Sequence, residues 1–147
     1  MTPKLFYRIS SVLLVLFAIG HSIGFSTVDP SWHADAAVAG MKSVTFPVQG
    51  FTRSYWDFFF GFGVFVSIVL LFSAVLAWRW SSKSAAELAT MTVERWAFAV
   101  AYVLIALATW RYFFLAPDVI STLAALALIG GAVSRPALSE PIPGSTG

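Results

Sequence analysis

The sequence contains no cysteine, which excludes disulfide bonds, thiolate metal sites, cysteine nucleophiles and thiol redox chemistry. Charge is scarce too: charged residues make up 11% of the chain, against about 25% in an average soluble domain. The net charge is only +2 and the basic residues form no patch, so we expect no nucleic-acid partner. Because no glycine-rich phosphate loop or metal-ligand motif occurs either, we expect no cofactor and no metal.

Apolar residues are abundant instead. Hydrophobic residues make up 59% of the 147 residues, and the mean hydropathy is +0.82. A water-soluble fold of this size could not bury so much apolar surface, so we expect lipid to surround the chain. A helix that crosses a bilayer needs about 20 apolar residues. Four segments approach that length, namely residues 9–26, 55–78, 96–115 and 119–133.

We therefore predict an all-α fold, a four-helix transmembrane bundle over residues 1–134 followed by a flexible tail over residues 135–147. Asp29 and Pro30 can start a short interfacial helix over residues 31–44, in the first outer loop. Residues 46–51 are expected to be irregular. The capping-box pattern from Ser84 to Glu87 is expected to begin the third long helix.

Charge asymmetry predicts the orientation of the chain. With both termini in the cytoplasm, the inner side carries six basic residues and the outer side three, as the positive-inside rule requires. The inner residues are Lys4, Arg8, Arg79, Lys83, Arg95 and Arg135, and the outer ones are Lys42, Arg53 and Arg111. We expect an integral protein of a bacterial inner membrane. The first segment also resembles a signal peptide, but its apolar run continues past Gly20 to Phe25, which favours an anchor.

Four polar side chains are expected at one level near the outer side. His21 lies late in the first segment, Asp57 begins the second, Arg111 ends the third and Asp118 begins the fourth. Polar side chains in a membrane are costly and suggest a functional site. We predict a ligand site with aromatic walls, whose contacts are His21, Asp57, Arg111, Phe58 and Trp110.

Each polar residue also has a structural interpretation. Asp57 closes a second capping-box pattern that starts at Ser54, and Asp118 follows Pro117 in a first helical turn where it can cap the helix. Arg111 can extend to the headgroups or pair with Asp57. His21 can bond a neighbouring backbone or serine group. Haem is not expected, because one of the two histidines is in a helix and the other in a loop.

Small residues suggest a second role, in helix packing. Gly20 and Gly24 form a GxxxG pattern, and Ala127 and Gly131 give the fourth segment a small-residue face. Either pair can mediate a homo-oligomer. An accessory protein that packs against a partner through these faces, without any ligand, is therefore one hypothesis for the function.

Two stretches carry a resemblance to known families. The runs Gly20-His21-Ser22-Ile23-Gly24-Phe25 and Val48-Gln49-Gly50-Phe51-Thr52-Arg53-Ser54-Tyr55-Trp56-Asp57-Phe58 resemble uncharacterised bacterial four-helix membrane proteins. The layout is also similar to DoxX-like proteins and to the emopamil-binding (EXPERA) superfamily, which includes sterol isomerases and ligand-binding proteins. Relative to that superfamily, His21 and Asp57 match in position only. No acid lies mid-membrane here, which departs from the isomerases.

The favoured function is the binding of a membrane lipid or a lipophilic small molecule in an intrabundle pocket near the outer leaflet. The alternative is an isomerase-type enzyme of the membrane in which His21 is the acid and base, because the reference pKa of histidine is about 6.5.

Overall fold

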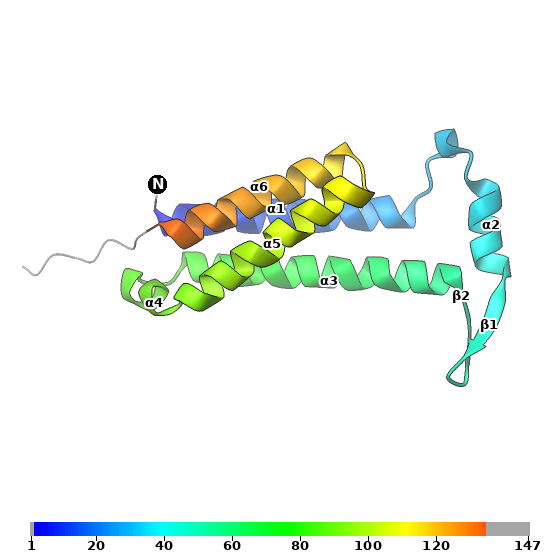
Figure 1. Ribbon diagram of the computed structural model, residues 1–147, viewed down its shortest axis with the longest axis horizontal. Coiled ribbons are helices and arrows are strands. Elements are labelled where there is room, and N and C mark those ends of the chain that lie inside the picture. The colour runs from blue at the N-terminus through cyan, green and yellow to red at the C-terminus, as the bar shows by residue number, and fades with distance from the viewer. Residues whose placement is uncertain (1, 135–147) are drawn as a thin grey trace, which may run out of the picture. The chain divides into compact units, whose positions relative to one another are not determined.

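The computed structural model describes residues 2–134 (Figure 1). Its elements are α1 (Pro3–Ser26), the 3₁₀ turn η1 (Pro30–Trp32), α2 (Asp35–Ser43), β1 (Thr45–Val48), β2 (Phe51–Ser54), α3 (Tyr55–Ser81), α4 (Ala85–Thr90), α5 (Thr92–Tyr112) and α6 (Leu115–Val133). The predicted tail, residues 135–147, lies outside the described residues.

Among the described residues, four helices are long and apolar enough to cross a membrane: α1, α3, α5 and α6. Much of their apolar surface faces outward, and on α3 both Phe62 and Phe72 are 67% exposed. Large apolar side chains exposed along a whole helix are expected where lipid is the solvent. The predicted fold class, all-α with four membrane-length helices and a short helix in the first long connection, is confirmed.

The described chain forms two compact units. The first contains the described residues of Met1–Leu13 and Ala74–Gly147, and we call it the Arg95 unit. The second contains Leu14–Ser73, and we call it the hairpin unit. Helices α1 and α3 each contribute one end to each unit.

The Arg95 unit packs parts of all four long helices around aromatic and small residues. The ring of Tyr7 on α1 meets the edge of Trp80 on α3 at 5.5 Å between centroids, and Trp80 meets Phe98 on α5 at 5.3 Å. On α6, a Cβ atom added to Gly131 would lie 2.8 Å from the Tyr7 ring. The glycine thus lets α1 and α6 approach closely, as small residues do between membrane helices.

The hairpin unit contains a β-hairpin that the sequence analysis missed. Strands β1 and β2 are antiparallel, with Val48 opposite Phe51 and a two-residue loop of Gln49 and Gly50. Both loop residues have positive φ angles, 47° and 86°, as the tight type I′ hairpin turn requires. The expectation of irregular chain over residues 46–51 was therefore wrong. Pro47 and the absence of an Asn-Gly pair concealed the strand signal.

The short helix is split into two pieces. The Asp29 side chain accepts a hydrogen bond from the Ser31 amide, so the predicted start at Asp29 and Pro30 is confirmed, although what begins there is the turn η1. His33 then adopts a left-handed conformation with φ of 49°, and α2 begins only at Asp35. On α2, Lys42 places its Nζ 4.4 Å from the Trp56 ring centroid at the start of α3.

The capping box at Ser84 is confirmed, but it does not begin the third long helix. The Ser84 hydroxyl accepts from the Glu87 amide, and the Glu87 carboxylate accepts from the Ser84 amide at 2.7 Å. These bonds begin the short helix α4, which ends at Thr90, and the C-cap residue Met91 has a non-helical ψ of 36°. Helix α5 starts at Thr92, so the connection contains a separate helical turn.

Candidate functional site

A groove in the hairpin unit is the site that the structure offers for a ligand. It is lined by Val48, Gln49, Phe51, Arg53, Asp57, Phe58, Gly61, Phe62 and Phe65, and its volume is about 520 Å³. This volume lies within the range of about 300–1,000 Å³ that small-molecule sites occupy. The groove is open along one side, since Phe62 and Phe65 are 67% and 61% exposed. The predicted enclosed pocket within the bundle stays a prediction.

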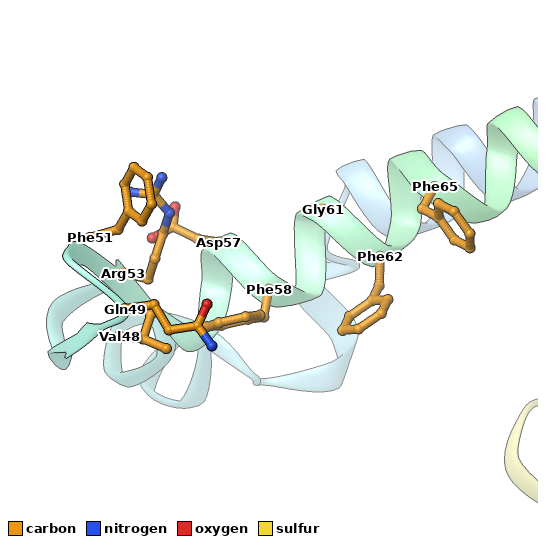
Figure 2. Close-up of a pocket in the computed structure, with 9 residues that line it drawn as sticks. All are labelled: Val48, Gln49, Phe51, Arg53, Asp57, Phe58, Gly61, Phe62 and Phe65. Carbon is orange, nitrogen blue, oxygen red and sulfur yellow. The ribbon is translucent and has the colours of Figure 1, made fainter.

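The floor of the groove is a stripe on α3. Phe58, Phe62 and Phe65 follow the helical spacing of four and three residues, so they project from the same side of α3 (Figure 2). Between them Gly61 has no side chain, and a Cβ atom there would meet nothing within 4 Å. At about 1.5 Å per residue, the stripe from Phe58 to Phe65 runs for roughly 10 Å. The helical spacing of these aromatics was the sequence signal for the groove.

The hairpin forms the polar end of the groove. Figure 2 shows Gln49, Arg53 and Asp57 at this end, away from Phe65. The hairpin is fixed against α3 by Phe46, whose ring stacks on Phe58 at 6.0 Å with an interplanar angle of 1°. The site therefore combines an apolar stripe with a small polar rim that carries one positive and one negative charge.

Asp57 has a structural role that the sequence predicted. Its Oδ2 atom accepts from the Ser54 amide at 2.7 Å and from the Ser54 hydroxyl at 3.0 Å, and the Asp57 amide donates back to that hydroxyl. The capping box at the start of α3 is thus confirmed. Because Asp57 is also exposed and lines the groove, capping leaves it accessible to a ligand.

His21 contacts backbone rather than the groove. Its Nε2 atom donates to the Gly63 carbonyl oxygen at 3.2 Å, so α1 and α3 are joined in the hairpin unit. One turn along, the Ser22 and Ser67 hydroxyls bond each other at 2.8 Å. The structural interpretation of His21, a bond to a neighbouring backbone group, is confirmed. Its role as acid and base stays a prediction.

Trp110, Arg111 and Asp118 belong to the Arg95 unit, so their convergence with His21, Asp57 and Phe58 also stays a prediction. Trp110 donates from Nε1 to the Thr122 hydroxyl at 3.0 Å, and the Arg111 guanidinium lies 5.2 Å from the Tyr112 ring centroid.

Asp118 lies in the first turn of α6, where the helix dipole favours an anion. This first-turn position is the one that the sequence analysis predicted, and a capping bond from the Asp118 side chain stays a prediction.

Arg95 is the residue whose importance the sequence analysis missed. It is 4% exposed, and its Nε atom donates to the Tyr7 hydroxyl at 3.0 Å. Its terminal nitrogens donate to the Leu88 carbonyl and to three carbonyls at the end of α6, those of Gly131, Ala132 and Ser134. A cation at a helix C-terminus is favoured by the helix dipole. No local pattern predicts this cluster, because Tyr7 and Gly131 lie 88 and 36 residues away.

The two predicted small-residue faces differ. Cβ atoms added to Gly20 and Gly24 would meet nothing within 4 Å, so this face is open. Ala127 is 7% exposed and Gly131 packs on Tyr7, so that face is used inside the Arg95 unit. Homo-oligomer formation stays a prediction for both pairs.

Comparison with known proteins gives no relative. No protein family, no curated protein and no solved structure matches this chain. The layout resemblances to the DoxX-like and emopamil-binding groups accordingly stay predictions. The described residues also contain no group of three His, Asp or Glu side chains placed to hold a metal ion. Within residues 2–134 the structure shows four helices long and apolar enough to cross a membrane, and an aromatic groove in the hairpin unit.

Proposed function

We propose that this membrane protein binds a lipid or a lipophilic small molecule in the groove of the hairpin unit. The observation that carries the proposal is the groove itself: three aromatic side chains along α3 lead to a rim that holds Arg53 and Asp57. Apolar walls with a few placed polar groups are typical of small-molecule sites. An amphipathic ligand fits because the apolar and polar parts lie at opposite ends.

The geometry favours one acyl chain or a similarly narrow apolar group. The stripe is about 10 Å long. Its middle is left open by Gly61, beside which no atom lies within 4 Å of an added Cβ atom. His21 is not part of the lining, so the proposal needs no proton transfer.

Binding can be tested with two matched phenylalanines. Phe62 and Phe72 are both 67% exposed on α3, but only Phe62 lines the groove. We expect F62A to weaken the binding of a short-chain phospholipid about three- to tenfold, because one aromatic contact is lost. F72A is expected to bind as the wild type does. The dissociation constants can be measured by native mass spectrometry in detergent. Equal binding by wild type, F62A and F72A would contradict the proposal.

We place the hairpin unit's loop on the outer side of a bacterial inner membrane, with both termini in the cytoplasm. The support is the excess of lysine and arginine at the opposite loops. The lack of native cysteine permits a direct test with single cysteines at Thr52, in β2, and at Ser82, after α3. A membrane-impermeant maleimide is expected to label T52C in intact spheroplasts, and S82C only after lysis. The reverse pattern would contradict this orientation.

A further inference from the structure

We infer that the ligand of the groove is a zwitterionic phospholipid whose headgroup carries a primary ammonium. The inference rests on the proposed lipid binding and adds the class of headgroup. The polar rim of the groove carries it, because the lining includes one guanidinium, one carboxylate and one amide, all at the hairpin end of the groove (Figure 2).

Arg53 supplies a contact for the phosphate. Its side chain is exposed, its guanidinium lies 5.0 Å from the Phe51 ring centroid, and one N–H donates to the Thr52 carbonyl at 2.9 Å. A guanidinium has five N–H donors in a planar fork, and this bond uses one of them. The remaining donors suit a phosphate, which guanidinium groups bind through paired hydrogen bonds.

Asp57 supplies a contact for the ammonium. The capping bonds from Ser54 both go to Oδ2, which leaves the Oδ1 atom of an exposed carboxylate for another donor. A primary ammonium offers three N–H donors to a carboxylate, whereas a quaternary ammonium offers none. Arg53 and Asp57 both line the groove, so one site offers a contact for each of the two charges that a zwitterionic headgroup carries.

The charge of the surrounding loop argues against an anionic headgroup. Between residues 27 and 57 there are three acids and two bases, so with neutral His33 this segment has a net charge of −1. One base, Lys42, lies over the Trp56 ring and does not line the groove. Sites for anionic lipids usually gather several basic residues. A headgroup without net charge fits this segment better.

The test compares four lipids with identical acyl chains: phosphatidylethanolamine, phosphatidylcholine, phosphatidylglycerol and diacylglycerol. Native mass spectrometry of the full chain in detergent gives a dissociation constant for each. We expect phosphatidylethanolamine to bind about tenfold more tightly than phosphatidylcholine and phosphatidylglycerol, which lack the ammonium contact to Asp57. Diacylglycerol, which has neither a phosphate nor an ammonium, is expected to bind about a hundredfold more weakly than phosphatidylethanolamine. R53Q is expected to weaken both zwitterionic lipids about tenfold. D57N, whose amide oxygen can still accept the capping bonds, is expected to remove the preference for ethanolamine over choline.

Controls separate headgroup recognition from general damage. R79Q changes an exposed arginine of the Arg95 unit, and D35N changes an exposed acid of the hairpin unit. Both variants are expected to bind all four lipids as the wild type does. Unchanged diacylglycerol binding by R53Q and D57N shows that the groove is intact. If phosphatidylglycerol or diacylglycerol binds as tightly as phosphatidylethanolamine while F62A still weakens binding, the headgroup inference is wrong and the proposed function stands. If F62A binds every lipid as the wild type does, the proposed function itself is wrong, and the headgroup inference that rests on it is wrong too.

Discussion

The two compact units use polar groups in opposite ways. In the Arg95 unit, one buried guanidinium is surrounded by five hydrogen-bond acceptors from α1, α4 and the end of α6. In the hairpin unit, Arg53 and Asp57 are exposed and stand at the edge of a groove. In a membrane, a charge inside protein must have its hydrogen bonds satisfied. The first arrangement therefore stabilises the fold, whereas the second leaves polar groups for a ligand.

The glycines and aromatic rings show the same contrast. In the Arg95 unit, Gly130 and Gly131 pack against the rings of Phe6 and Tyr7, so helices meet closely. In the hairpin unit only Gly63 does so, against Phe25, while Gly61 opens onto the groove. Close packing in one region and open aromatic surface in the other suggest that stability and binding are located in different parts of this chain.

The largest predicted effect on stability comes from removing the hydrogen bonds of the buried Arg95. R95Q removes the charge and most donors, and leaves the carbonyls at the end of α6 and the Tyr7 hydroxyl without their partner. We expect a loss of about 3 kcal/mol in the free energy of unfolding. R95K, with one compact ammonium, is expected to lie between R95Q and wild type. Thermal unfolding in detergent measures the difference.

The exposed Arg79 is the matched control for this prediction, and R79Q is expected to stay within about 0.5 kcal/mol of wild type. If R95Q and R79Q unfold at the same temperature, Arg95 does not stabilise its unit.

A smaller loss of stability is expected when a methyl group is added at Gly63, where the Phe25 ring packs against the glycine. A Cβ atom there would lie 2.5 Å from the Phe25 ring, so G63A forces this ring away and costs about 1–3 kcal/mol. G61A is the control, because its added Cβ atom meets nothing within 4 Å. The double variant G63A/F25A removes the clash and is expected to lose less stability than the sum of the single changes. Strict additivity in detergent unfolding would show that these two residues are not in contact.

The smallest predicted effect is a local loss of stability in α4 at acid pH. The Ser84 amide, the Ser84 hydroxyl and Lys83 together lower the pKa of Glu87 from 4.5 to about 2. Since the pKa of the folded state lies below the ordinary value, the carboxylate stabilises α4 above pH 4.5. This stabilisation is lost as the pH falls from 4.5 to about 2. Hydrogen exchange of the α4 amides is expected to lose protection over that range, after correction for the intrinsic rate.

E87Q keeps a side chain that serves in a capping box but cannot titrate. Its α4 amides are expected to show the same protection throughout that range. An equal loss of protection in E87Q would assign the acid effect to another group.

The membrane-length helices were predictable because length and hydropathy decide them. All four were found, although α1 begins at Pro3 rather than at residue 9 and α3 extends to Ser81 rather than residue 78. Local capping patterns at Ser54 and Ser84 were also predictable, since both partners lie three residues apart. The hairpin was missed because its turn depends on the positive φ of Gln49, a residue that rarely adopts it.

The candidate site was predictable in part. Asp57 and Phe58 do line the groove, because both lie at the start of a helix whose boundary the sequence marks. Gln49 and Arg53 were missed as site residues, since only the hairpin brings them to α3. The sequence analysis placed Arg95 only among the basic residues of the inner side, because its hydrogen-bond partners come from remote segments. Contacts between distant segments are what one sequence, read alone, does not reveal.

Photo-crosslinking in a bilayer tests lipid binding at the groove most directly. Phospholipid with a photoactivatable acyl chain would be irradiated with the full chain, and the adducts mapped by peptide mass spectrometry. The account predicts that adducts concentrate at Phe58, Phe62 and Phe65. Phe72 and Leu107, which are as exposed as Phe62 and Phe65, are expected to carry far fewer adducts. Adducts spread over all apolar faces in proportion to their exposure would contradict it.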